Sequence, residues 1–244
     1  MARENSIIDL QDVSLHKGET QILKNISWNI KKGGHWALIG PNGAGKTSIL
    51  KIISGNLWPS SGKVKVLGKE FGKADLRELK KKIGWVSSFL TEKIPNNEDI
   101  LEIVISGKFA SFGVYEKITE KDRKKAKGLL KLMDCDYVIG RNFNVISQGE
   151  KQKVLIARAL MAEPLILLMD EPCIGLDMKA RQNLLNSISK ICEETETTII
   201  YVTHHIEEIF PEIENALLLK DGTAFLQGKA KDILIKENLE KTFG

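Results

Sequence analysis

The first third of the chain alternates apolar and polar residues with the two-residue period of β-strands. Two alternating runs, Ile7–Leu10 and Ile22–Ile30, are separated by polar turns, and residues 62–70 continue the pattern. Such alternation places apolar side chains on one face only, so these runs predict an antiparallel sheet with one buried face. A further short strand is predicted at Ile83–Val86.

Three other short runs, Trp36–Ile39, Leu165–Met169 and Thr198–Val202, are apolar almost throughout. Strands of a parallel sheet have this composition because both of their faces are covered. Near the end of the chain, Lys220–Thr223 joins two β-like runs as a hairpin. We therefore expect a second, mainly parallel sheet.

Apolar residues at helical spacing predict the helices. Ser48–Ile53 follows the first apolar strand, and residues 178–194 carry a long apolar stripe. Residues 96–160 contain helical patterns and no strand signal, and Thr119 with Asp122 has the spacing of an N-terminal cap. The pattern as a whole predicts an α/β fold with an inserted helical segment.

The turn between the strand Trp36–Ile39 and its helix reads Gly40-Pro41-Asn42-Gly43-Ala44-Gly45-Lys46-Thr47. This segment, here called the phosphate loop, matches G-x-x-x-x-G-K-[ST] in the strand–turn–helix context that the pattern requires. Its glycines let backbone N–H groups converge on a phosphate at the start of the helix, where Ser48 also lies. Lys46 can reach the β- and γ-phosphates, and the Thr47 hydroxyl suits Mg²⁺. The loop predicts nucleoside triphosphate binding.

A pair of acidic residues, Asp170 and Glu171, follows the apolar run Leu165–Met169. A carboxylate at the carboxyl end of a parallel strand is well placed to hold Mg²⁺, often through water. A second carboxylate beside it can accept a proton from an attacking water. Taken alone, the pair is equally consistent with a helix N-cap. The preceding phosphate loop favours Mg²⁺ and hydrolysis.

The segment Ile146–Lys151 has the spacing of a capping box, because Ser147 precedes Glu150 by three residues. One interpretation is simply a well-capped helix. The other is a second anion site, in which the serine hydroxyl, the glycine backbone and the helix dipole all face one phosphate. The residues alone leave both open.

Composition adds limits to this picture. Hydrophobic residues at 42% and charged residues at 28% are ordinary for a soluble globular protein. No apolar run approaches the roughly 18 residues of a membrane helix, and the first residues lack the apolar core of a signal peptide, so we expect a cytoplasmic protein. The net charge of +4 and the basic clusters Lys80–Lys82 and Arg123–Lys125 give no firm sign of a nucleic-acid partner. We expect reduced, partly buried thiols at Cys135, Cys173 and Cys192.

The motifs occur in the order and spacing of ABC-type ATPases: Gly40–Thr47, Ile146–Glu150, Leu165–Glu171, Gly175–Asp177 and Thr203–His204. The chain resembles the ATP-binding subunit of an ABC transporter over essentially its whole length. The resemblance implies a P-loop NTPase core with a mainly parallel sheet and an N-terminal antiparallel β subdomain. Residues 1–244 would form one nucleotide-binding domain, with residues 89–160 as its inserted helical subdomain. The signature, usually L-S-G-G-Q, is Ile146-Ser147-Gln148-Gly149-Glu150 here.

The resemblance also implies a head-to-tail dimer, of two copies or with a related ATPase subunit, that encloses two ATP molecules. Each ATP would touch the phosphate loop of one chain and Ser147, Gln148 and Gly149 of the other. Glu171 would be the general base, and Asp170 would hold Mg²⁺ through water. His204 would contact the γ-phosphate, and Asp177 would lie in the turn that signals across the interface.

Two positions depart from the family pattern. Ser88 stands where a glutamine commonly contacts Mg²⁺, and serine reaches the metal only through an intervening water. His16 and Lys17 stand where an aromatic residue often stacks on adenine. We therefore expect looser Mg²⁺ coordination and weak recognition of the base, with GTP able to compete.

The function implied by the resemblance is ATP hydrolysis that drives transport through separate transmembrane permease subunits, from the cytoplasmic face of the cell membrane. Residues 97–106 resemble those of metal-chelate or vitamin importers. The alternative is a soluble ABC ATPase without a permease, for example in cofactor assembly. A small-molecule kinase is disfavoured by the signature and His204, and a GTPase by the lack of an Asn-Lys-x-Asp motif.

Overall fold

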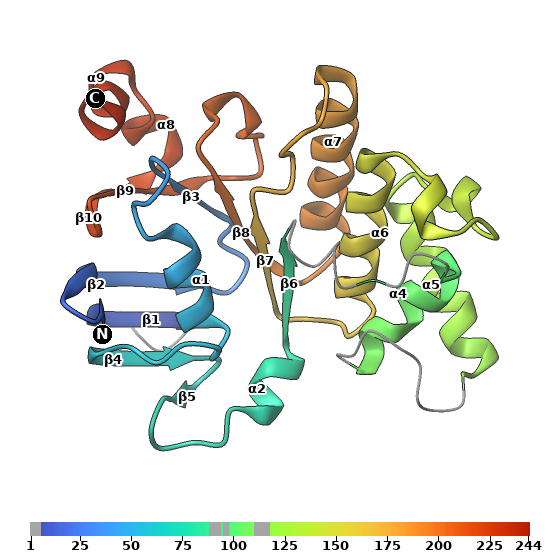
Figure 1. Cartoon of the computed structure of the whole chain (residues 1–244), viewed down its shortest axis with the longest axis horizontal. Coiled ribbons are helices and arrows are strands. Elements are labelled where there is room, and N and C mark those ends of the chain that lie inside the picture. Colours follow the sequence, from blue (N-terminus) through green and yellow to red (C-terminus); the bar gives the residue numbers. More distant parts are fainter. Residues whose placement is uncertain (1–5, 88–93, 95–97, 110–117) are drawn as a thin grey trace. The chain divides into compact units, whose positions relative to one another are not determined.

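Residues 6–87, 94, 98–109 and 118–244 are described by a computed structural model of the chain. The chain divides into two units, Met1–Ile83 with Thr198–Gly244 and Gly84–Thr197. The first unit holds an antiparallel sheet and most of a mainly parallel one, and the second holds a group of helices beside two strands (Figure 1).

The antiparallel sheet of the first unit has the strand order β2-β1-β4-β5. Its strands are β1 (Ser6–Lys17), β2 (Thr20–Lys31), β4 (Ser61–Val66) and β5 (Lys69–Glu70). One face is apolar and buried, as the alternation predicts. The run 62–70 is not one strand, because Leu67 and Gly68 have φ values of 47° and 77° and turn the chain back on itself. β1 and β2 are also longer than the alternating runs, and shifts in register interrupt their pairing.

The mainly parallel sheet of the first unit has the strand order β10-β9-β3-β8. β3 (Trp36–Ile39) runs parallel to both β8 (Thr198–Thr203) and β9 (Asn215–Lys220). β9 and β10 (Thr223–Lys229) form the predicted antiparallel hairpin, whose turn residues Asp221 and Gly222 both have positive φ. β3 and β8 are buried almost throughout, so the predicted buried strands are confirmed in this unit.

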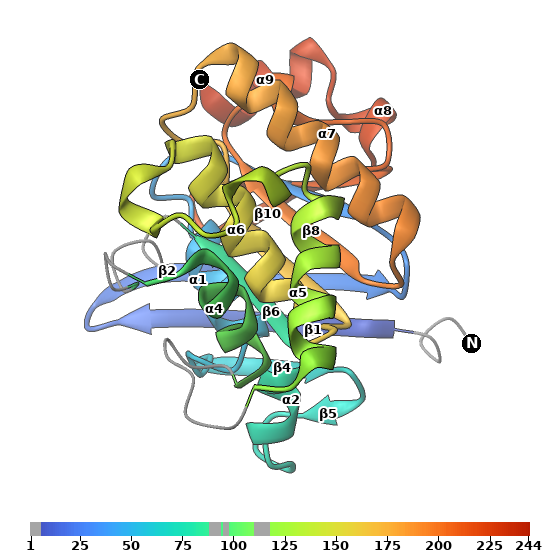
Figure 2. The ribbon, with the colours of Figure 1, turned by 90° about the vertical axis from the view of Figure 1, so that its right-hand side faces the viewer.

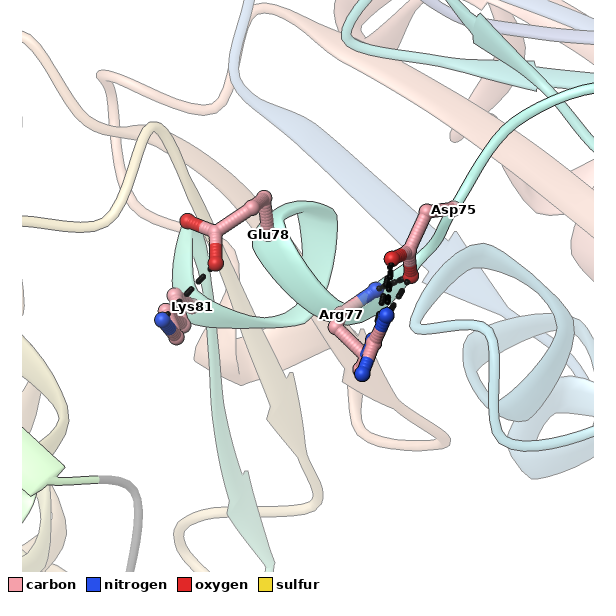
Figure 3. Close-up of polar contacts among 4 residues, drawn as sticks. All are labelled: Asp75, Arg77, Glu78 and Lys81. Carbon is pink, nitrogen blue, oxygen red and sulfur yellow. Dashed lines mark hydrogen bonds and ion pairs between the residues drawn. The ribbon is translucent and has the colours of Figure 1, made fainter.

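The helices of the first unit are short. They are α1 (Lys46–Ile53), α2 (Arg77–Lys81), α8 (Ala230–Ile233), α9 (Lys236–Phe243) and the 3₁₀ turn η4 (Ile206–Glu208). Two exposed ion pairs lie at α2: Asp75 with Arg77 at 2.7 Å, and Glu78 with Lys81 at 2.8 Å (Figure 3). Exposed pairs of this kind contribute little to stability because water screens them.

The second unit is mostly helical. It contains α4 (Ile100–Ser106), α5 (Glu120–Leu132), α6 (Gln148–Leu160), α7 (Met178–Glu194), and the 3₁₀ turns η1 (Gly107–Phe109), η2 (Asp136–Val138) and η3 (Phe143–Val145). The α-helices described there pack against one another, α6 against each of the others (Figure 2). Both predicted capping boxes are present, at Thr119–Asp122 on α5 and at Ser147–Glu150 on α6. In the part of the chain that the structure describes, no helix is long and apolar enough to cross a bilayer.

Among the described residues, β6 (Ile83–Ser87), which enters the second unit at Gly84, and β7 (Ile166–Asp170) are neighbouring strands. Residues 166–169 are wholly buried, as a strand covered on both faces requires. Leu165 is an exception to the predicted run, because it precedes the strand and is 39% exposed. The predicted α/β fold, with an antiparallel sheet and a mainly parallel one, is confirmed.

Candidate functional site

The phosphate loop joins β3 to α1 in the first unit. Gly45 is the N-cap residue of α1, has φ of 104°, and supplies no side-chain cap. The φ of Gly45 favours glycine, and a Cβ atom there would also lie 2.6 Å from the Leu23 Cδ2 atom and displace that side chain. The first turn of α1 is therefore not capped by a side chain. An anion is a suitable partner for such a helix start.

Gly40 begins the loop immediately after β3. A Cβ atom there would lie 2.1 Å from the carbonyl oxygen of Leu219 on β9, which only glycine avoids. Inside the loop, the Ala44 N–H donates to the Pro41 carbonyl at 3.2 Å. The loop is thus ordered by its own backbone and by close contact with the sheet.

Lys46 is buried, and its ammonium lies against the loop. The Nζ atom donates to the carbonyl oxygens of Gly40 at 2.7 Å and Pro41 at 3.1 Å. Thr47, in contrast, is exposed at the start of α1, and Ser48 is half-buried. A fixed cation at an uncapped helix start has the chemistry needed to bind phosphate oxygens.

His204 follows β8 in the same unit. Ile39 of β3 pairs with Thr203 of β8, so Gly40 and His204 leave neighbouring parallel strands at the same edge of the sheet. The His204 ring lies against that of His205, with ring centroids 4.2 Å apart. Ligands of open α/β sheets bind outside the carboxyl ends of strands, and this edge carries both the phosphate loop and His204.

The acidic pair lies in the second unit. Asp170 is the last residue of β7, and Glu171 follows with φ of 51°, a left-handed conformation that non-glycine residues adopt at some cost. The Ile174 N–H donates to the Glu171 carbonyl at 3.2 Å and closes a turn. Glu171 is therefore not a helix N-cap. Asp177 is the N-cap residue instead, and its carboxylate accepts from the Ala180 N–H at 2.8 Å at the start of α7.

The signature segment, Ile146–Glu150, starts α6. The Glu150 Oε2 atom accepts from both the N–H and the hydroxyl of Ser147, each at 2.7 Å, and the Glu150 N–H donates to the Ser147 hydroxyl at 3.3 Å. Burial acts to raise the pKa of Glu150, but the hydrogen bonds from Ser147 and Tyr137 outweigh it and lower that pKa. A negative charge thus stands beside Ser147. The capping-box interpretation is confirmed, and the anion site stays a prediction.

Gln148 and Gly149 form the first turn of α6. Gln148 is exposed, and a Cβ atom at Gly149 would lie 3.4 Å from the Ala180 Cβ atom on α7. Gln148 is therefore accessible to a partner, whereas Gly149 is confined by α7. Tyr137, which the sequence reasoning did not single out, bonds to Glu150, and burial followed by this bond raises the pKa of Tyr137 to about 12.

Ser88, expected near Mg²⁺, lies outside the described residues. His16 and Lys17 are exposed at the end of β1, in the same unit as the phosphate loop. Among the described residues, no group of three or more His, Cys, Asp or Glu could hold a metal by itself. The predicted ligands, the Thr47 hydroxyl in the first unit and the Asp170 carboxylate in the second, each offer oxygen of the kind that Mg²⁺ binds, and Mg²⁺ uses few protein ligands beside waters and substrate phosphates.

Comparison with known proteins identifies the family. The sequence pattern of the family described as "ABC transporter" matches residues 23–174. The chain is 45% identical to the uncharacterized ABC transporter ATP-binding protein YlmA of Bacillus subtilis, over 97% of this chain and 90% of YlmA. It is 39% identical to a putative ABC transporter ATP-binding protein of Streptococcus mutans, over 98% and 92% of the two chains.

Solved structures show the same fold. CbiO1 of Clostridium perfringens, described as part of the ABC transporter complex cbiONQ, superposes with a TM-score of 0.84 at 27% identity, over 98% of this chain and 94% of CbiO1. The dimeric ABC transporter cassette MJ0796 superposes with a TM-score of 0.78 at 31% identity, over 91% and 98% of the chains. The chain therefore belongs to the ABC transporter family of ATP-binding proteins and is an ATP-hydrolysing cassette.

Proposed function

We propose that this chain pairs with a second copy, or with a related ATPase subunit, and that the pair binds and hydrolyses ATP to drive transport through separate transmembrane permease subunits. The family membership supports an ATP-driven transport role, and the dimeric MJ0796 cassette supports pairing. CbiO1, a relative described as part of a transporter complex, supports a membrane partner. In this proposal the chain lies peripherally on the cytoplasmic face of the cell membrane.

The observation that carries the proposal is the phosphate loop with its buried Lys46. Backbone N–H groups at the uncapped start of α1, together with the Lys46 ammonium, bind the β- and γ-phosphates of ATP. His204, which leaves the neighbouring strand at the same edge, contacts the γ-phosphate. The exposed His16 and Lys17 give the base only weak support, because neither is a strong stacking platform.

The chemistry is divided among a few side chains. Glu171 acts as general base and accepts a proton from the attacking water. Asp170, through water, and Thr47 hold Mg²⁺, which when bound neutralises charge on the phosphates. Ser147, Gln148 and Gly149 of one subunit contact the ATP held by the other, and Asp177 lies in the turn that signals across the interface. Residues 89–160 serve as the helical subdomain that carries the signature.

The transported substrate belongs to the permease rather than to this chain. Relatives that are 33% and 34% identical carry names of different importers, a spermidine/putrescine import protein and a methionine import protein. These names, together with the resemblance of residues 97–106, favour import. Purification from detergent with a permease subunit would support the transport role. Purification without any membrane partner would favour the soluble alternative.

The first test is substitution of the proposed base, Glu171→Gln. We expect ATP hydrolysis to fall by about 10²-fold or more, because an amide cannot accept the proton, while ATP binding stays within about twofold. Malachite-green phosphate release and binding of a fluorescent ATP analogue measure the two effects. Glu193→Gln, an exposed change on α7, is the matched control and should retain full activity. A Glu171→Gln protein with full hydrolysis would remove Glu171 from this role.

A further inference from the structure

A buried carboxylate lies directly behind the segment that carries His204. Glu208, the last residue of η4, is 2% exposed. Its Oε2 atom accepts from the Thr203 hydroxyl at 2.7 Å and from the Tyr201 hydroxyl at 3.0 Å, and both donors are buried side chains of β8. Thr203 belongs to the motif Thr203–His204, whereas Glu208 and Tyr201 belong to none of the motifs that mark the nucleotide site.

Burying a carboxylate in this way costs free energy that packing alone would not require. A carboxylate loses its hydration on burial, and apolar residues of similar volume often stabilise a core at least as well. Two hydroxyl groups must be oriented toward one oxygen atom to compensate. This free-energy cost indicates that the Glu208 carboxylate has a role in fixing the backbone to which its two hydroxyl partners belong.

The attached backbone is the segment around His204. Thr203 immediately precedes His204, and its hydroxyl oxygen also accepts from the N–H of His205 at 3.0 Å. The hydroxyl thus links Glu208 to the residue that follows His204, while its own residue is fixed in β8 by pairing with Ile39. Backbone on both sides of His204 is therefore held by one connected set of hydrogen bonds.

The turn that leads from Glu208 back to the sheet is held as well. The ring of Phe210 packs edge-to-face on Tyr201, with centroids 5.8 Å apart and planes at 89°. Tyr201 therefore contacts both Glu208 through its hydroxyl and Phe210 through its ring. Tyr201, Thr203, Glu208 and Phe210 are buried in this segment, while His204 and His205 between them are half-buried.

We propose that Glu208 is a positioning residue for His204: it acts through Thr203 and Tyr201 to hold the His204 imidazole where it meets the γ-phosphate. The inference rests on the proposed role of His204. Because Glu208 itself touches no phosphate, its loss disturbs the step in which charge develops on the γ-phosphate and spares the binding of ATP by the phosphate loop.

The test compares Glu208→Leu, Glu208→Gln and Thr203→Val by steady-state ATP hydrolysis. We expect Glu208→Leu to lower kcat about tenfold or more with KM for ATP changed by less than about twofold. Glu208→Gln should retain most of kcat, because both hydroxyls donate to one oxygen and an amide oxygen can accept from both. Thr203→Val removes the linking hydroxyl at nearly constant volume and should lower kcat in the same way. Glu240→Leu, an exposed change on α9, is the control and should be neutral.

A double mutant separates the inference from the function on which it rests. If His204→Ala lowers kcat and adding Glu208→Leu lowers it no further, Glu208 acts through His204. If the two losses multiply, the inference is wrong and the role of His204 stands. The same conclusion follows if folded Glu208→Leu and Thr203→Val proteins both keep full kcat while the His204→Ala protein does not. If His204→Ala itself keeps full kcat, the role of His204 fails and the positioning of His204 by Glu208 fails with it. Circular dichroism verifies folding, and Thr203→Val decides if Glu208→Leu does not fold.

Discussion

The hydroxyl of Ser147 donates to Glu150 in this structure, although the proposed dimer requires the same residue to face a phosphate. The lowered pKa of Glu150 means that this carboxylate is ionised at neutral pH. A negative charge about 4 Å from a phosphate is unfavourable, by about 1 kcal/mol where water fully screens the pair and by more where it does not. The usual glutamine of the signature carries no such charge.

We therefore expect Glu150→Gln to lower the ATP concentration needed for half-maximal dimerisation by about threefold to tenfold, as 1 kcal/mol implies. Glutamine still serves a capping box, so the melting temperature should change little. Light scattering during an ATP titration, in the Glu171→Gln background, measures the effect. Glu150→Ala, which removes charge and cap together, should lower the melting temperature. An unchanged midpoint for Glu150→Gln would show that Glu150 does not face the phosphate.

Individual residues differ in how much of their role can be read from sequence. Gly40, Gly45 and Lys46 were predictable because each occupies a set position in a pattern whose physical basis is known. Glu208 was not, because its partners lie five and seven residues earlier in β8 and the contact exists only once η4 folds back on the strand. The left-handed conformation of Glu171 has no sequence signal, because glutamate is not among the residues that favour it.

At the scale of elements, the N-terminus of α5 gives a prediction with a defined pH dependence. The hydrogen bond from Lys108, followed by those from Thr119, lowers the pKa of Asp122 to about 2. A lowered carboxyl pKa stabilises the fold above the unfolded-state value of 3.8, and this contribution is lost as the pH falls toward 2.

We expect Asp122→Asn to lower the free energy of unfolding at pH 6 by about 1 kcal/mol, the usual value of a helix cap. The difference from the unmodified protein should shrink as the pH is lowered from 5 toward 2, because the Asp122 carboxyl takes up its proton first in the unfolded state, near pH 3.8, and only near pH 2 in the folded state. Urea unfolding at several pH values measures it. Asp232→Asn, an exposed change on α8, should show no comparable difference. A gap that stayed constant with pH would contradict the charge-based explanation.

The helices and strands differ in how far the sequence alone predicts them. Helices α5 and α6 were predicted because capping boxes mark their starts. The ends of β1 and β2 were not, because these strands continue beyond the alternating runs through irregular pairing. α2 and η4 are too short to show a helical period. Leu165 was assigned to β7 by its apolar character, yet it lies before the strand and is partly exposed.

At the scale of the whole molecule, strand order was the information that sequence lacked. β3 lies between β8 and β9, although β8 and β9 come much later in the chain. Local patterns predict each strand but do not identify its neighbours, because pairing depends on contacts between distant residues. This pairing places the phosphate loop and His204 at one edge of the sheet, so their proximity could be inferred only from the family resemblance.

Exposed apolar residues near Asp177 favour association of the whole molecule with a second subunit. Ile174 is 49% exposed and Met178 is 86% exposed, and they flank Asp177, where the proposed interface lies. With ATP bound, we expect light scattering to show a dimer of the Glu171→Gln protein. Met178→Glu should weaken that dimer at least about tenfold, because it places a charge in a contact from which water is excluded. Phe225→Glu, a similarly apolar-to-charged change on β10, should leave the dimer intact. A Glu171→Gln protein that stays monomeric at saturating ATP would exclude self-pairing and leave only a related ATPase subunit as the partner.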